Sequence, residues 1–178
     1  VHVPADFSSA AFFLVAASIV PGSDLVLEAV GMNPRRTGLL ATLRDMGADI
    51  AVEREAVQGG EVVADLRVRH APLHGIEVPV GRVPDMIDEF PALFVAAALA
   101  DGPTVVRGAA ELRVKESDRL ATMSTALRTL GARIDETPDG ATLHGGTALT
   151  GGHVHAQGDH RIAMSAAIAG QLASAPVW

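Results

Sequence analysis

An internal repeat constrains this sequence more than any other feature. Residues 43–50 read LRDMGADI, and residues 127–134, 84 positions later, read LRTLGARI. The Ala-rich runs that precede these two segments are about 80 positions apart, so the second cycle contains about four additional residues. Such spacing is typical of supersecondary units that bury their apolar faces against one another. We therefore expect a fold built from repeated units.

The hydrophobic pattern of each cycle predicts the element order βαβαββ. Alternating apolar residues indicate the strands, and apolar residues at helical spacing indicate the helices. The first cycle has a helix at 10–17, a strand at 25–30, a helix from Leu39 to Met46, and strands at 49–54 and 62–69. The second has a strand at 76–78, a helix at 89–98, a strand at 104–107, a helix at 118–130, and a hairpin at 133–144. A third cycle begins at Asp159 and continues through the apolar run 162–169.

The Ala-rich helices are apolar on most sides, which predicts that they are buried. The expected fold class is α/β, with repeated βαβαββ units that enclose buried helices. We treat residues 1–178 as one domain, with cycles at about 1–74 and 75–150 and an incomplete cycle at 151–178. The sequence begins without Met and stops soon after an apolar segment, so we expect a piece of a longer protein.

Composition excludes several classes of function. The formal net charge of −7 argues against nonspecific nucleic-acid binding, and an aromatic content of 3% argues against base stacking. No apolar run reaches the roughly 18 residues of a membrane span. The absence of cysteine removes disulfides and thiolate catalysis, and it is compatible with the cytoplasm, the compartment that we expect.

A charged heptad, RVKESDR at residues 113–119, precedes the second periodic helix. We expect Ser117 or Glu116 to cap that helix. Lys115 and Arg119 then lie near the positive end of the helix dipole, where cations are unfavourable. An anionic ligand would explain the placement, because helix N-termini bind anions. The alternative is an ordinary solvated cap.

Three aspartates, Asp6, Asp88 and Asp159, stand at the heads of the three Ala-rich helices. Each can be an ordinary N-cap, with Pro91 placing the second cap near Asp88. Arg161, two residues after Asp159, repeats the placement of Arg119 in another cycle, which suggests that both bind one shared anion.

Carboxylates beside these cations indicate proton transfer. Glu116 lies next to Lys115, and Asp88 joins it if the helix ends converge. His160 can also move protons near neutral pH, or it can orient Asp159 or Glu116. His153 and His155 lie on one face of an expected strand and, together with His160, offer three possible metal ligands. The alternative is that they are ordinary histidines at the edge of a strand, which are common. We expect no metal.

Five segments together resemble the 5-enolpyruvylshikimate-3-phosphate synthase family. They are residues 6–11, 33–38, 86–91, 113–119 and 159–164, which extend over essentially the whole chain. The sister family of UDP-N-acetylglucosamine enolpyruvyl transferases shares the fold but lacks the pairing of Lys-Glu-Ser-Asp-Arg with Asp-His-Arg.

The resemblance implies a two-domain enzyme of six βαβαββ units, of which this chain forms most of the second domain. The substrates are phosphoenolpyruvate, held by Arg119 and Arg161, and shikimate-3-phosphate, held by Asp88 and Lys115. The shikimate 5-hydroxyl attacks C2 of phosphoenolpyruvate, C3 is protonated, and phosphate then leaves.

Asp88 and Glu116 are the implied proton-transfer pair, with Lys115 as a relay. The resemblance implies no metal and no organic cofactor. It also implies that the herbicide glyphosate contacts Arg119 and Arg161.

Two departures from the family pattern concern the site. Glu111 stands where many members have Asn. The Asp of the family pattern can be aligned with Asp85 as well as with Asp88, although the distance to the end of the helix favours Asp88. The missing N-terminal domain, the expected partner, carries the main shikimate-phosphate contacts, so we expect the isolated chain to be inactive. The alternatives are a non-catalytic module that complements another half, a UDP-N-acetylglucosamine enolpyruvyl transferase-like enzyme, and a nucleic-acid end-processing enzyme of similar architecture.

Overall fold

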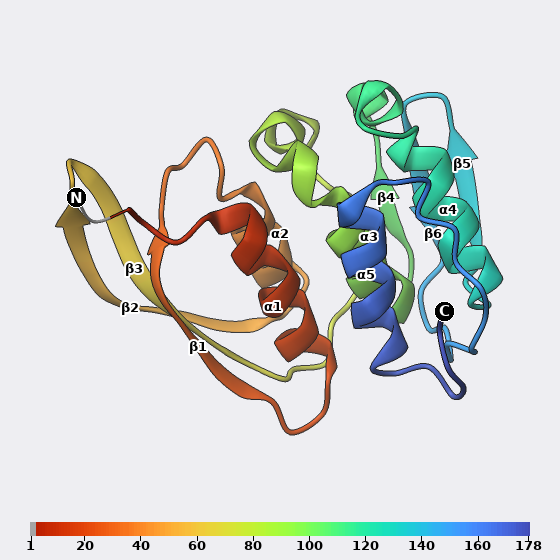
Figure 1. Cartoon of the computed structure of the whole chain (residues 1–178), viewed down its shortest axis with the longest axis horizontal. Helices are drawn as coiled ribbons and strands as arrows, with labels where there is room; N and C mark the ends of the chain where they lie inside the picture. The colour runs from red at the N-terminus through yellow and green to blue at the C-terminus, as the bar shows by residue number, and fades with distance from the viewer. Residues whose placement is uncertain (1–2) are drawn as a thin grey trace.

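The computed structural model describes residues 3–178, in which a group of helices lies between two three-stranded sheets (Figure 1). The elements of the first cycle are α1 (Phe7–Ile19), β1 (Asp24–Gly31), α2 (Gly38–Asp45), β2 (Asp49–Gln58) and β3 (Glu61–Arg69). The second cycle contains the 3₁₀ helix η1 (Val80–Glu89), α3 (Phe90–Leu99), β4 (Thr104–Val106), the 3₁₀ helix η2 (Ala110–Val114), α4 (Arg119–Thr129), β5 (Ile134–Thr137) and β6 (Gly140–Leu143). Helix α5 (His160–Gly170) belongs to the third.

The two sheets have the same topology. Their strand orders are β1-β3-β2 and β4-β6-β5, so the last strand of each cycle lies in the centre and pairs antiparallel with both neighbours. The chain before each Ala-rich helix forms one parallel bridge to the strand after that helix, Ala5 to Val30 and Glu77 to Val105. The strand expected at 76–78 is therefore only a bridge.

The repeat extends to individual hydrogen bonds. Arg44 donates through Nε and Nη2 to the Ile50 carbonyl at 3.1 and 2.8 Å, and Arg128 donates in the same way to the Ile134 carbonyl at 3.2 and 2.8 Å. Each guanidinium ties the end of its helix to the strand that follows. The matching segments of the sequence are thus matching structures.

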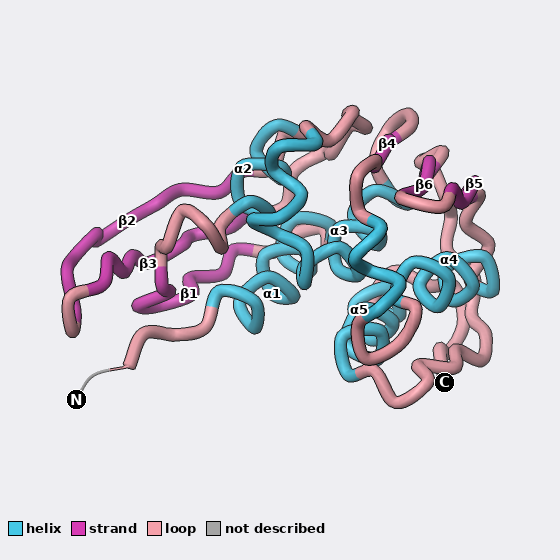
Figure 2. Tube along the Cα trace, turned by 90° about the horizontal axis from the view of Figure 1, so that it is seen from above, coloured by secondary structure: helices cyan, strands magenta, loops and turns pink. Residues whose placement is uncertain are grey.

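The Ala-rich helices form the interior, as expected from their composition. Every residue of α3 from Phe90 to Ala98 is buried, because α1, α4, α5 and η1 surround that helix. The sheet of β1, β2 and β3 extends away from the helices on one side, and the second sheet lies on the other (Figure 2). The amino ends of the helices are consequently held by a rigid apolar core.

Two of the expected helix caps are wrong in position. Asp118, rather than Ser117 or Glu116, caps α4 by accepting a hydrogen bond from the Ala121 N–H at 2.9 Å. Glu89 occupies the cap position of α3 and makes no side-chain cap bond, because η1 delivers the chain directly into that helix. The side chain of Asp88 is thereby free for other contacts. Asp6 and Asp159 cap α1 and α5 as predicted.

The described residues include no helix with both the length and the apolar character needed to cross a membrane.

Candidate active site

The heads of α3, α4 and α5 meet at Asp88, the penultimate residue of η1. Nη1 of Arg119, the first residue of α4, donates to Asp88 Oδ1 at 2.8 Å. Arg161, the second residue of α5, places Nη2 at 4.0 Å from Asp88 Oδ2 and donates from Nη1 to the Asp88 carbonyl at 3.4 Å. The two arginines that the sequence assigns to one anion therefore converge on one carboxylate.

Arg119 is buried in a cage of three carboxylates. Its side chain is 1% exposed, and its Nε donates to Asp159 Oδ2 at 2.9 Å. Its Nη1 binds Asp88, and its Nη2 donates to Glu116. Burial lowers the pKa of Arg119, but the carboxylates outweigh burial and hold that pKa above its ordinary value. The guanidinium is therefore charged, and each of its three nitrogens donates one hydrogen bond to a carboxylate.

Asp159 fixes Arg119 from behind. It is 0% exposed, it accepts from the Arg161 N–H at 2.9 Å as the cap of α5, and it accepts from Ser117 Oγ at 3.1 Å. Burial raises the pKa of Asp159, whereas the hydrogen bonds from Arg119, Arg161 and Ser117 together hold it below its usual value. An ionised, inaccessible carboxylate suits the anchoring of Arg119. The sequence marks Asp159 only as a cap, because its pairing with Arg119 across 40 residues leaves no local signal.

Lys115 connects the heptad to Asp88. Its Nζ lies 2.6 Å from Glu111 Oε1 and 3.7 Å from Asp88 Oδ1. The hydrogen bond with Glu111 holds the pKa of Lys115 above its ordinary value. Burial raises the pKa of Asp88, but Arg161, Lys115 and Arg119 together hold it below its usual range. Asp88 is thus an ionised, half-buried acceptor among three cations.

Glu116 and His160 lie at the edge of this cluster. The side chain of Glu116 is 54% exposed and binds Arg119. His160 begins α5 with an exposed side chain, and its ring has no hydrogen bond with any of residues 3–178. Arg119, rather than His160, orients both Asp159 and Glu116.

The histidines at 153 and 155 do not form the metal site that can be drawn from the sequence. They lie in a loop, where the expected strand is reduced to a bridge between Gly152 and Val177. The ring of His153 stacks on Trp178 instead, with centroids 6.4 Å apart. Residues 3–178 contain no group of three or more His, Asp or Glu side chains placed to hold a metal ion.

Known proteins match both the sequence and the fold. The family model described as EPSP synthase (3-phosphoshikimate 1-carboxyvinyltransferase) matches residues 1–178. The 3-phosphoshikimate 1-carboxyvinyltransferase of Xanthomonas euvesicatoria pv. vesicatoria (strain 85-10) is 71% identical over 177 residues, which are 99% of this chain and 40% of that protein. The EPSP synthase of Acinetobacter baumannii superposes with a TM-score of 0.96 at 50% identity, over 98% of this chain and 41% of that one.

A more distant neighbour shares the fold alone. The enolpyruvyl transferase NikO from Streptomyces tendae superposes with a TM-score of 0.70 at 20% identity, over 97% of this chain and 37% of that one. The predicted fold class is confirmed by these neighbours. The chain spans about 40% of the length of the curated relatives that it matches. The chain belongs to the EPSP synthase (3-phosphoshikimate 1-carboxyvinyltransferase) family.

Proposed function

We propose that the complete protein transfers the enolpyruvyl group of phosphoenolpyruvate to the 5-hydroxyl of shikimate-3-phosphate and releases phosphate, in the shikimate pathway of aromatic amino acid biosynthesis. This chain supplies one half of the cleft and is inactive alone. The observation that carries the proposal is the convergence of Arg119 and Arg161 on Asp88 at the heads of three helices. The names of the most similar relatives support the same reaction. The cytoplasm is the expected compartment.

Each charged group at the heads of the helices has a role in this proposal. Arg119 and Arg161 bind the carboxylate of phosphoenolpyruvate, because a guanidinium presents paired donors to such a group. Glyphosate occupies the same subsite. Asp88 and Lys115 face shikimate-3-phosphate. Asp88, which its lowered pKa keeps ionised, accepts the 5-hydroxyl proton in this proposal.

The reaction then needs a balanced pair of proton transfers. As the bond from the 5-oxygen to C2 forms, the hydroxyl proton passes to Asp88, and a proton is delivered to C3 from Glu116 or through Lys115. The result is a tetrahedral intermediate. Loss of a proton from C3 to the group that delivered it then expels phosphate from C2 and restores the double bond, and the proton held by Asp88 leaves with the phosphate. His160, at the head of α5, is a further candidate for moving these protons.

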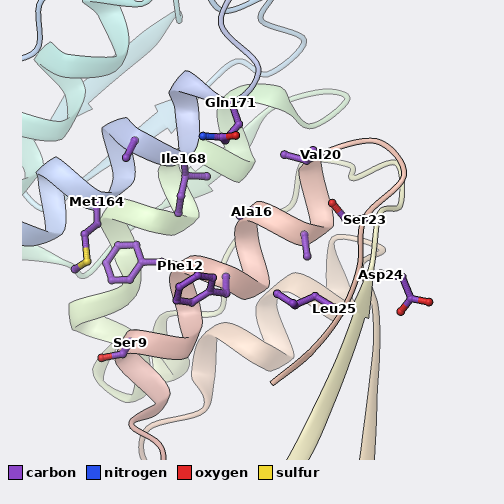
Figure 3. A pocket seen from close by; sticks show the side chains of 13 residues that line it. Ser9, Phe12, Ala16, Val20, Ser23, Asp24, Leu25, Met164, Ile168 and Gln171 are labelled. Atoms are coloured by element: carbon purple, nitrogen blue, oxygen red, sulfur yellow. The ribbon is translucent and has the colours of Figure 1, made fainter. Parts of the chain in front are cut away.

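We also propose that the chain is part of the second of two domains, with cycles at 1–74, 75–150 and an incomplete 151–178. An apolar groove of about 620 Å³ between α1 and α5 supports this (Figure 3). It is lined by Phe12, Phe13, Leu25, Met164 and Ile168, and Phe13 is 57% exposed.

Between α1 and α3, and between α3 and α5, the Ala-rich helices are each covered by a further helix. Helix α2 packs on α1 and on η1, which leads into α3, while α4 packs on both α3 and α5. By the logic of the repeat, the groove receives a third such helix from the remainder of the longer protein, with Leu and Met at the spacing seen in α2 and α4.

The test combines this chain with the separately produced remainder of the longer protein, including the helix proposed for the groove, and measures phosphate release from the two substrates. Activity should appear only in the mixture, and Arg119→Ala should abolish it. Arg133→Ala, an exposed arginine in the loop between α4 and β5, is the matched control and should leave activity unchanged.

A mixture that associates without releasing phosphate would favour a non-catalytic module. Activity with UDP-N-acetylglucosamine in place of shikimate-3-phosphate would instead identify the sister reaction.

A further inference from the structure

Glu89, the residue after Asp88, is a buried carboxyl that the reaction does not use. It is 4% exposed, and it occupies the cap position of α3 without capping that helix. Its side chain instead crosses to α1, where Oε1 accepts a hydrogen bond from Ser8 Oγ. Ser8 is 2% exposed, so this bond joins the heads of two buried helices from different cycles.

Arg36 completes the connection from the loop before α2. Its Nη2 donates to Ser8 Oγ at 2.8 Å and to Asp6 Oδ1 at 3.1 Å. Asp6 in turn caps α1 by accepting from the Ser9 N–H at 2.8 Å. One chain of polar contacts therefore runs from the half-exposed Arg36 through Ser8 to the buried Glu89, and it holds three separate segments together.

The surroundings of Glu89 make its position specific. Burial raises the pKa of its carboxyl, and the nearby Asp88 acts in the same direction, while Ser8, Arg161 and Arg36 oppose the rise. A buried carboxyl is unfavourable unless its hydrogen bonds are satisfied. The apolar contacts of α3 hold the helix in the core, and the bond from Ser8 adds a directional contact at its first turn.

We propose that Glu89 is a positioning residue, whose link through Ser8 to Arg36 fixes the first turn of α3 on α1 and thereby holds Asp88 where Lys115, Arg119 and Arg161 meet. Consecutive Cα atoms are about 3.8 Å apart, so Asp88 follows any movement of Glu89. The effect on turnover rests on the proposed function, but the effect on Asp88 does not.

The first experiment needs no substrate. The pKa of the Asp88 carboxyl is measured by NMR titration in the chain itself and in Ser8→Ala, Glu89→Ala and Glu89→Gln. Both alanine variants should let the pKa of Asp88 rise toward its ordinary value, because the carboxylate moves away from its three cations. Glu89→Gln, which still accepts from Ser8, should keep it low.

Ser18→Ala is the matched control, since it removes another fully buried hydroxyl of α1, one that donates to the Leu14 carbonyl at 2.7 Å. It should leave the pKa of Asp88 unchanged. Circular dichroism verifies folding, and Ser8→Ala decides the matter if Glu89→Ala does not fold. An Asp88 pKa in Ser8→Ala equal to that of the unsubstituted chain overturns the proposal.

The second experiment measures kcat and KM after complementation with the remainder of the longer protein. Misplacement of a reacting group by about 1 Å costs up to about a hundredfold, so kcat should fall about ten- to a hundredfold in Ser8→Ala. Glu89→Gln should retain most activity, and Ser18→Ala all of it. If no mixture is active, the proposed function fails while the titration still judges Glu89. A kcat that falls equally in Ser8→Ala and Ser18→Ala overturns the positioning role.

Discussion

Replacing Asp159 with alanine should destabilise the protein more than the same change at Asp88 or Glu116, the other two carboxylates around Arg119. Removing one partner of a buried ion pair costs about 3–5 kcal/mol, and the lower end applies because Arg119 retains Asp88 and Glu116. Loss of the cap of α5 adds about 1 kcal/mol. We therefore expect the free energy of unfolding to fall by about 4 kcal/mol, a large part of the 5–15 kcal/mol typical of a domain.

Two further variants test the roles of charge and burial. Asp159→Asn keeps an oxygen for the Arg161 N–H, which donates to Oδ1, but removes the charge and the Oδ2 acceptor of Arg119 Nε, so it should cost about 1.5–3 kcal/mol. Asp88→Asn, at a side chain that is 38% exposed, should cost less than about 1 kcal/mol. Urea unfolding followed by circular dichroism at neutral pH measures all three. Equal effects at positions 88 and 159 would refute the argument from burial.

The pH dependence of this difference has a definite sign. The folded-state pKa of Asp159 is lowered, so its contribution is fully present above the unfolded pKa of about 3.9 and is lost as the pH falls through the folded pKa. The gap in unfolding free energy between the unsubstituted protein and Asp159→Asn should therefore close only in acid. A gap that persists unchanged in acid would contradict the ion-pair assignment.

Three other outcomes follow from the same structure. Glu116→Gln should lower the KM for phosphoenolpyruvate in the complemented enzyme by up to about fivefold, since it removes a half-exposed competitor for Arg119; an unchanged KM would argue against competition. Glu89→Gln should stabilise the protein increasingly as pH rises. Because the folded-state pKa of Glu89 is raised, its contribution to the free energy of unfolding is complete below the unfolded pKa of about 4.3 and is lost as the pH rises through the folded pKa. Thermal unfolding midpoints of the two proteins that differ by the same amount at all pH values would exclude this. Gly140→Ala should lower the free energy of unfolding by about 1–3 kcal/mol, because its Cβ would lie 2.0 Å from the Val106 carbonyl oxygen, whereas Gly81→Ala, with open space around its Cβ, should change little in the same urea assay.

The sequence predicts the fold well because the same hydrophobic pattern occurs in both cycles of the repeat. The order of elements and the buried helices follow from hydrophobic spacing that is legible in both cycles. The errors arise where local signals compete. The strand at 76–78 shrinks to a bridge at Glu77, since its only partner is the short β4. The caps of α3 and α4 each lie at a different residue from the one expected. A 3₁₀ helix precedes α3 and a bend precedes α4, and these segments determine the backbone path into each helix.

The convergence of Arg119 and Arg161 was predictable from the sequence, but the carboxylate partners of Arg119 were not. Cations misplaced at two helix heads indicate Arg119 and Arg161 correctly as neighbours. No local pattern shows that Asp159 anchors Arg119, because those residues are 40 positions apart, or that Glu89 reaches Ser8 across 81. Both contacts depend on how cycles pack together. Local sequence patterns therefore reveal these charged residues but not the buried partners that another cycle supplies.

The exposure of the carboxylates around Arg119 determines which of them an incoming anion can displace. Asp159 is 0% exposed and also caps α5, so releasing it would leave a buried charge and an uncapped helix. The side chains of Asp88 and Glu116 are 38% and 54% exposed, so water can solvate either carboxylate when Arg119 donates to a ligand instead. The two carboxylates proposed for proton transfer are therefore the two that anion binding would set free. A fixed guanidinium with one permanent and two exchangeable partners accounts for cations that would otherwise oppose their own helix dipoles.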